Sequence, residues 1–89
     1  MMSPLFTAER RTARALAGRA VHRVFVERFG RGWRRSRPLY DLDTFEVLSV
    51  FADVEQKLGV TFTDDDIEFI ETEGELVSRA AAALMRAGS

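Results

Sequence analysis

Cysteine is absent from this chain of 89 residues, and histidine, tryptophan and tyrosine each occur once. Without cysteine there is no disulfide, no thiolate metal site and no thiol nucleophile, which fits a reducing compartment. Two prolines and six glycines are too few for a loop-rich or disordered protein. The apolar runs are too short to span a bilayer, and Arg10, Arg11 and Arg14 interrupt any secretory signal. We therefore expect a soluble, cytoplasmic protein.

A single small domain over residues 1–89 is expected, because this length is near the lower limit for folding around one core. The net charge of −1 conceals a strong asymmetry between the two halves. Residues 1–40 carry ten arginines against two glutamates, whereas residues 41–89 carry three basic residues against twelve carboxylates. This pattern indicates either separate binding faces or mutual attraction of the two halves within one fold.

The first part of the chain is predicted to form one long helix. Ser3 is a candidate N-cap with Pro4 as the first helical residue, and Thr7 is a second candidate start. Apolar residues then recur at spacings of three and four, and Gly30 occupies a position where a glycine ends many helices. A short strand remains an alternative for residues 24–29, which are apolar on more than one side.

Three more helices are expected after an arginine-rich loop at residues 30–42. Each begins with a capping residue that has an acid three positions later, a variant of the capping box: these pairs are Asp43 with Glu46, Thr63 with Asp66, and Thr72 with Glu75. Gly59 should end the first of the three. The apolar residues expected in the core, beside those of the first helix, are Val47, Phe51, Val54, Leu58, Phe62, Ile70, Leu76, Val77 and Leu84.

The order of these segments resembles the acyl carrier proteins, in which Asp-Ser-Leu opens the second helix. "LDTFEVLSVFADVEQKLGV" (residues 42–60) aligns with that helix without a gap when Thr44 takes the place of the serine. "FTDDDIEFIETEGELV" (residues 62–77) is similar to the family's third helix and the entry to its fourth. The first helix matches by position only. The resemblance implies an all-α, acyl-carrier-like bundle of three main helices plus one short helix.

In this family the serine carries phosphopantetheine, which a phosphopantetheinyl transferase attaches with the help of magnesium. The resemblance implies that Thr44 is the attachment position and that Asp43 helps to hold the magnesium ion. The β-methyl group of threonine, however, restricts its χ1 angle and crowds the attacking oxygen. The loop before the site is also shorter than is usual in the family. We expect a carrier-like module that is not routinely modified, with a working carrier bearing phosphopantetheine on Thr44 as the alternative.

The partners implied by the resemblance are enzymes of fatty acid, polyketide or related pathways, which recognise the carrier by binding to its second helix. The residues expected to contact a partner are Phe45, Glu46, Ser49, Asp53, Ile70 and Trp33. Phe25, Phe29 and Trp33 exceed what one helix stripe can bury, so we expect part of this aromatic group to be exposed. The chain is then expected to be a monomer or a weak homodimer.

Other functions are weakly indicated. His22 has no paired ligand spacing, so no metal is expected, and no nucleophile–base pair suggests an enzyme. Acids at residues 64–66 suit the first turn of a helix and lack the spacing of a calcium loop. The segment "RGWRRSR" (residues 31–37) could contact phosphates, but the pI of about 5.8 argues against nucleic acid. An unrelated helical interaction or nucleic-acid-binding protein is the remaining alternative.

Overall fold

The chain forms an all-α bundle in a computed structural model that describes residues 4–87, with side chains from residue 8 onward. Its helices are α1 (Pro4–Phe29), α2 (Thr44–Leu58), α3 (Asp64–Phe69) and α4 (Glu73–Ala87), with a short 3-10 turn, η1, at Leu39–Asp41. The prediction of three main helices plus a short one is therefore confirmed. The alternative of a strand at residues 24–29 is wrong, because α1 continues to Phe29. The expected N-cap Ser3 lies outside the described residues.

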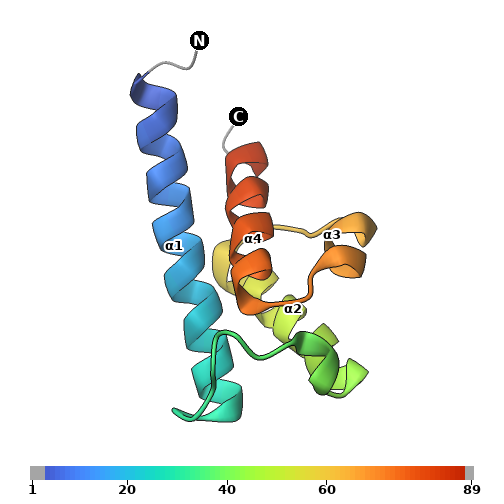
Figure 1. The fold of residues 1–89 in the computed structure, drawn as a ribbon. Helices are drawn as coiled ribbons and strands as arrows, with labels where there is room; N and C mark the ends of the chain where they lie inside the picture. The colour runs from blue at the N-terminus through green and yellow to red at the C-terminus, as the bar shows by residue number, and fades with distance from the viewer. Residues whose placement is uncertain (1–3, 88–89) are drawn as a thin grey trace.

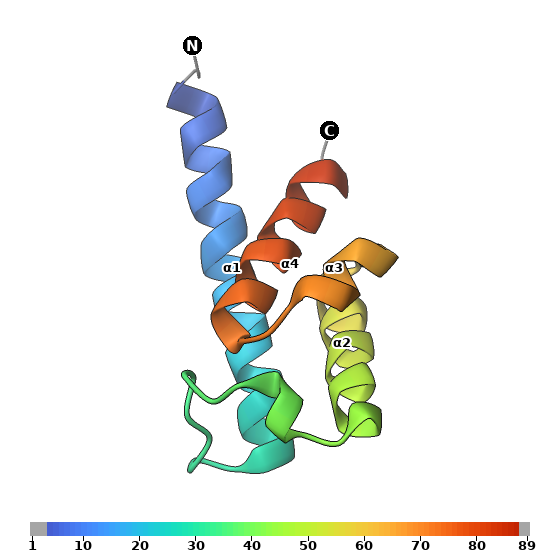
Figure 2. The same ribbon diagram turned by 45° about the vertical axis from the view of Figure 1, so that its right-hand side comes forward.

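Figure 1 shows α1 and α4 lying side by side, with α2 behind α4 and α3 on the side of α4 that is remote from α1. In the turned view of Figure 2, α2 lies below α3 on the side of the molecule that is remote from α1. The loop after α1 folds back along the lower part of that helix before it reaches η1. The backbone N–H of Leu39 donates to the carbonyl of Glu71 at 2.8 Å, which ties η1 to the connection between α3 and α4.

The helix ends follow the capping residues in the sequence. Asp43 caps α2, but its side chain accepts from the N–H of Phe45 and forms no reciprocal bond with Glu46. Thr63 and Asp66 form the full capping box of α3. Gly59 ends α2 in the left-handed conformation, with φ of 67°, as only glycine does at low cost.

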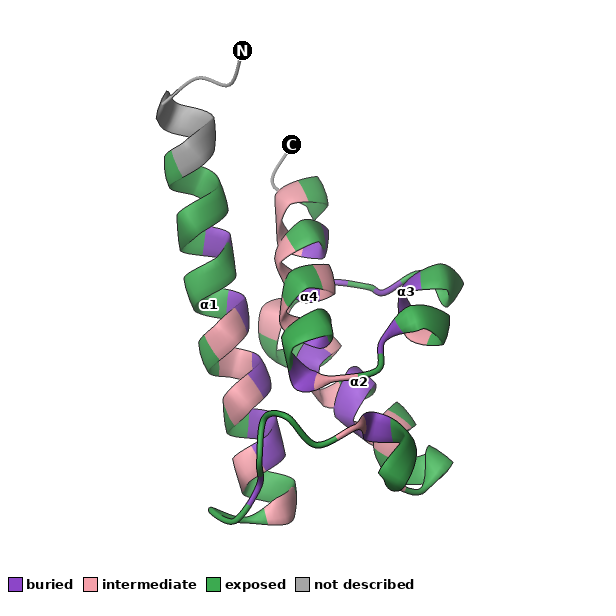
Figure 3. Cartoon of the chain, in the orientation of Figure 1, coloured by how far each residue is buried: buried purple, intermediate pink, exposed green. Residues whose placement is uncertain are grey.

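Apolar side chains from α1, α2 and α4 fill the core, and Figure 3 shows the buried residues gathered on the facing sides of the helices. Phe51 and Phe62 meet edge to face with ring centroids 6.0 Å apart. Most of the expected core is buried, but four of its members are only partly so: Val47, Leu58, Val77 and Leu84. Val50 is 1% exposed and was missed, because it lies at the edge of the apolar stripe read from the sequence.

Ion pairs join the basic and acidic halves of the chain. Arg28 on α1 contacts Asp53 on α2 through Nη2 at 2.6 Å, and Arg35 in the loop lies 3.4 Å from Glu73 on α4. Mutual attraction within the fold therefore accounts for part of the charge asymmetry. Within residues 4–87, no helix is both long and apolar enough to cross a membrane.

Candidate functional site

The start of α2 presents a hydroxyl group in an open position. Asp43 precedes the helix, and its Oδ1 accepts a hydrogen bond of 2.7 Å from the N–H of Phe45. Thr44 is the first residue of the helix and is exposed. Unpaired backbone N–H groups and the positive end of the helix dipole meet at such a position. The site is therefore accessible and favourable for an anion attached to Thr44.

Three large apolar side chains are exposed in the 3-10 turn before this helix start and in the first turns of α2. Tyr40 in η1 is 78% exposed, Phe45 81% and Leu48 50%. Phe45 and Leu48 are three residues apart and so lie on the same side of α2. We call Tyr40, Phe45 and Leu48 the α2 face. Exposed apolar groups gathered in this way are typical of a protein contact surface.

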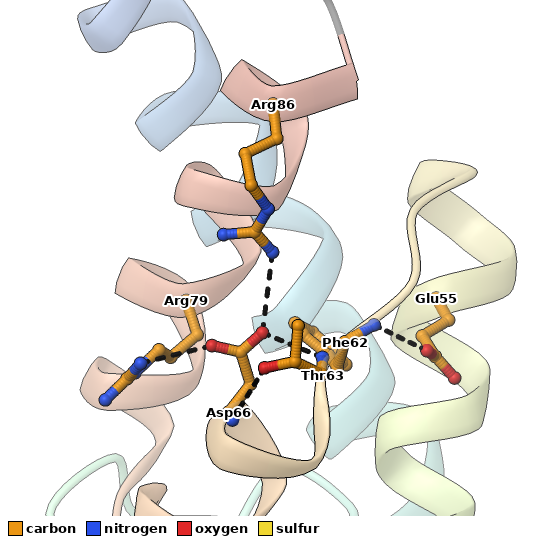
Figure 4. Close-up of polar contacts among 6 residues, drawn as sticks. All are labelled: Glu55, Phe62, Thr63, Asp66, Arg79 and Arg86. Carbon is orange, nitrogen blue, oxygen red and sulfur yellow. Dashed lines mark hydrogen bonds and ion pairs between the residues drawn. The ribbon is translucent and has the colours of Figure 1, made fainter.

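Two acidic residues of α2 are less available to a partner protein than the sequence suggested. Both Nε and Nη2 of Arg28 contact Oδ2 of Asp53, at 2.8 and 2.6 Å. Glu55 turns inward, where its Oε2 accepts from the N–H of Phe62 at 2.7 Å (Figure 4). Glu46 is exposed and Ser49 is half-buried. Exposed acids remain beside Thr44 at Asp41, Asp43 and Glu46, so the surface there combines apolar and acidic side chains.

The expectation that Trp33 contacts a partner is wrong. Trp33 is 7% exposed, and its ring stacks on Phe25 and Phe29 with centroids 4.5 and 5.1 Å apart. The loop after Gly30 folds back onto α1 and so covers aromatic residues that one helix stripe could not bury. Ile70 is also 7% exposed and belongs to the core, so its assignment to the partner surface is wrong too.

Glu73 is the residue that sequence reasoning missed. It is 3% exposed at the start of α4, and its Oε1 accepts from the indole Nε1 of Trp33 at 2.9 Å. Nδ1 of His22 lies 3.4 Å from the same oxygen, and Nε of Arg35 lies 3.4 Å from the other. The signal in the sequence was a single indole N–H that needs an acceptor when buried. Glu73 holds the arginine-rich loop against α1 and α4.

Asp66 forms a second buried carboxylate cluster, in which it joins α3 to α4 (Figure 4). Its Oδ2 accepts from the N–H of Thr63 at 2.9 Å, and Nη1 of Arg79 lies 3.1 Å from Oδ1. Burial alone raises the pKa of this carboxyl group, but the bonds from Thr63 and Arg79 and the charge of Arg86 outweigh burial, so that the pKa lies below 3.8. Asp66 therefore stays ionised and structural.

Metal binding has no support in the described part of the chain, where no three His, Cys, Asp or Glu side chains are grouped to hold an ion. His22 contacts Glu73 and Arg35. The acids at residues 64–66 begin α3, and one of them is the capping residue Asp66.

The geometry thus brings Asp43, Thr44, Phe45 and Glu46 together at one exposed helix start, with Ser49 and Asp53 farther along the same helix. Comparisons of the chain with family models, with curated proteins and with solved structures give no match.

Proposed function

We propose that this protein is an acyl-carrier-like docking module. Enzymes of an acyl pathway, such as fatty acid or polyketide synthesis, would bind around the start of α2, and Thr44 would stay unmodified in most molecules. The observation that carries the proposal is the exposed Thr44 in the first turn of α2, behind the capping Asp43 and beside Phe45. The resemblance of residues 42–77 to the acyl carrier proteins supplies the class of partner.

The residues at the helix start suit a phosphopantetheine group in exposure and charge. Phosphate attached to the Thr44 hydroxyl would lie near the N–H groups of the first turn, which favour anions. One oxygen of Asp43 accepts from Phe45, and the other could face a magnesium ion during transfer. When bound, the group supplies a thiol that carries acyl chains as thioesters. The threonine oxygen is nevertheless a poor nucleophile here, because the adjacent methyl group restricts its approach.

The α2 face supports a protein partner. Its three members expose large apolar surfaces to solvent, and burial of apolar area contributes about 25 cal/mol per Å² to association. Asp53 and Glu55, which could attract a basic partner, are engaged by Arg28 and Phe62. Glu46 stays exposed, so docking should combine apolar contact at the α2 face with a charge contribution that salt screens.

A working carrier is the second candidate. It is favoured by the exposure of Thr44, since the side chain is open to an enzyme that could force the slow reaction. The two candidates predict different masses for the protein recovered from its native cells, because phosphopantetheine adds a fixed mass to every modified molecule.

The test uses a broad-specificity phosphopantetheinyl transferase with coenzyme A and magnesium, and reads the intact mass. We expect most of the wild-type chain to remain unmodified and Thr44→Ser to react faster, because the change removes the methyl group and keeps Asp43. Thr44→Ala should not react, which excludes Ser36 and Ser49 as attachment sites. Rapid, complete modification of the wild type would establish the working carrier instead.

Docking is tested in the Thr44→Ser protein, with the transferase as the partner. Phe45→Ser and Leu48→Ser should each slow modification, because they remove apolar contact from the α2 face. Leu16→Ser is the matched control, since Leu16 is 47% exposed on α1 and lies outside this face. Equal rates in all three variants would show that the α2 face does not contact the transferase. Failure of Thr44→Ser to react at all would contradict carrier-like docking.

A further inference from the structure

An open groove of about 1580 Å³ lies between α1 and the first turns of α4. Its apolar lining includes Ala15 and Val77, and the arginines that line it are Arg14, Arg19, Arg23 and Arg35. Figure 1 shows α1 and α4 side by side above the arginine-rich loop, and Arg35 and Ser36 of this loop also line the groove. We call this surface the basic groove.

A smaller hollow continues from the basic groove across the start of α4. The two share Arg14, Thr72 and Gly74, and the hollow is also lined by Phe69 and Glu75.

Phe69 at the end of α3 is 59% exposed. Asp65 is exposed four residues before Phe69 and so shares its side of the helix. Glu68 is exposed three residues after Asp65, and we call Asp65, Glu68, Phe69 and Glu75 the acidic patch. Arg79 lines the same hollow, but its guanidinium contacts Asp66 at 3.1 Å.

We propose that the basic groove of one molecule receives the acidic patch of a second copy of this chain. The basic groove and the acidic patch meet at the start of α4. The groove lies on the side of α1, and the patch lies on the side of α3. A two-fold rotation about an axis that runs along this part of α4 places each groove opposite the other molecule's patch. Such an interface is closed and self-complementary, because the same pair of contacts forms twice.

The chemistry of the two surfaces favours a second copy over nucleic acid. Glu27 and Glu73 also line the groove and pair with Arg23 and Arg35. The groove is therefore only moderately basic, which suits a patch with a few carboxylates better than a continuous phosphate backbone. The apolar part of its lining suits an aromatic side chain such as Phe69. A Cβ atom added at Gly74 would find no atom closer than 3.9 Å, so the small residue at the centre leaves room for close approach. The interface is independent of the α2 face and of the proposed function.

This dimer differs from the one suggested by the sequence. Phe25 and Trp33 are buried within the molecule and cannot form the contact. Each contact would rest on one aromatic side chain and a few exposed charges, which is typical of the weak, reversible class of interface. The monomer and the dimer should therefore exchange as concentration and salt change.

The experiment is a charge exchange followed by sedimentation equilibrium at low and high salt. The groove variant is Arg14→Glu with Arg19→Glu, and the patch variant is Asp65→Lys with Glu68→Lys. All four residues are exposed, so circular dichroism should show an unchanged fold. We expect each variant alone to raise the dissociation constant of the dimer by at least about tenfold, because like charges then face each other.

An equimolar mixture of the two variants should restore association, since both contacts in the mixed dimer again join opposite charges. Arg31→Glu with Arg34→Glu is the matched control, because these exposed loop residues do not line the groove, and it should dimerise like the wild type. A wild type that stays monomeric at every concentration, a mixture that does not recombine, or growth into open chains would each overturn the proposal. Binding of a single-stranded oligonucleotide by a monomeric wild type, lost in the groove variant, would assign the groove to nucleic acid instead.

Discussion

The indole Nε1 of Trp33 donates a hydrogen bond of 2.9 Å to Oε1 of Glu73, although 40 residues separate the two in sequence. The bond connects the arginine-rich loop to the first turn of α4 inside a nearly dry environment. Arg35 and His22 approach the same carboxylate. Glu73 thus adds a buried polar anchor to a loop that the stacking of Trp33 on Phe25 and Phe29 also holds against α1.

Replacing Glu73 by Ala should lower the free energy of unfolding by about 1–3 kcal/mol, because the buried indole N–H of Trp33 then has no acceptor. Urea denaturation measures the change. Glu71→Ala is the matched control, since Glu71 is exposed two residues earlier, and it should alter stability by less than about 0.5 kcal/mol. Equal losses in the two variants would show that the Glu73 cluster does not stabilise the fold.

Phe51→Ala should cost about 3–5 kcal/mol, because the ring is fully enclosed and its loss leaves a cavity beside Phe62. The ring is 2% exposed in the structure. On the same helix, Leu48→Ala removes a half-exposed side chain and should cost far less. A loss below about 1 kcal/mol for Phe51→Ala, measured by thermal or urea unfolding, would mean that the inner face of α2 is assigned wrongly.

Lowering the pH should reduce the free energy of unfolding, partly because Asp66 becomes protonated. The folded pKa of this carboxyl group lies below its unfolded value of 3.8, so the unfolded chain binds the proton more readily. The stability that Asp66 contributes is therefore fully present above the unfolded pKa and is lost as pH falls through the folded pKa. We expect Asp66→Asn to be less stable than the wild type near neutral pH and the difference to shrink below about pH 4.

Unfolding free energies measured across that pH range check the prediction for Asp66. Asp64→Asn is the control, because Asp64 is exposed in the first turn of the same helix. A difference between the wild type and Asp66→Asn that stays constant as pH falls would contradict the ionic role of Asp66.

Gly59→Ala should destabilise the protein by about 1–2 kcal/mol, because φ is 67° there and a Cβ atom strains a left-handed residue. Space is not the cause, since no atom lies within 4 Å of the added Cβ. At Gly32 the added Cβ also meets open space, and the backbone there is not left-handed. Gly32→Ala should therefore be neutral or slightly stabilising, and thermal unfolding of the pair separates backbone strain from crowding.

Local signals in the sequence predicted the helices well. Asp43 and Gly59 bound α2, Thr63 and Asp66 open α3, and Gly30 follows α1. These features depend on contacts within a few residues, so they can be read without the tertiary fold. Of the three predicted capping boxes, only that of Thr63 and Asp66 has both bonds. Asp43 caps the N–H of Phe45 without Glu46, which is exposed. Thr72 accepts from the N–H of Glu75, but the Glu75 carboxylate accepts from the N–H of Glu71 instead of that of Thr72.

The surface of the candidate site could not be predicted in the same way. Whether Trp33 is exposed depends on the path of the loop, and whether Asp53 is open to a partner depends on Arg28, which lies 25 residues away. Ile70 follows the last turn of α3, where its burial is decided by the turn into α4. Periodicity within one helix gives no information on such distant contacts, whereas the capping residue Asp43 did locate Thr44 in the first turn of α2.

The burial of Trp33 gives the molecule a built-in optical probe. It is the only tryptophan in the chain, it stacks on Phe25, and the guanidinium carbon of Arg37 lies 5.6 Å from its ring centre. Its emission should be shifted toward the blue while the loop is docked and should move to the red when the loop leaves α1. Trp33 fluorescence therefore reports detachment of the arginine-rich loop, whereas circular dichroism reports the loss of helix. If the loop opens before the helices unfold, the fluorescence transition should precede the circular dichroism transition.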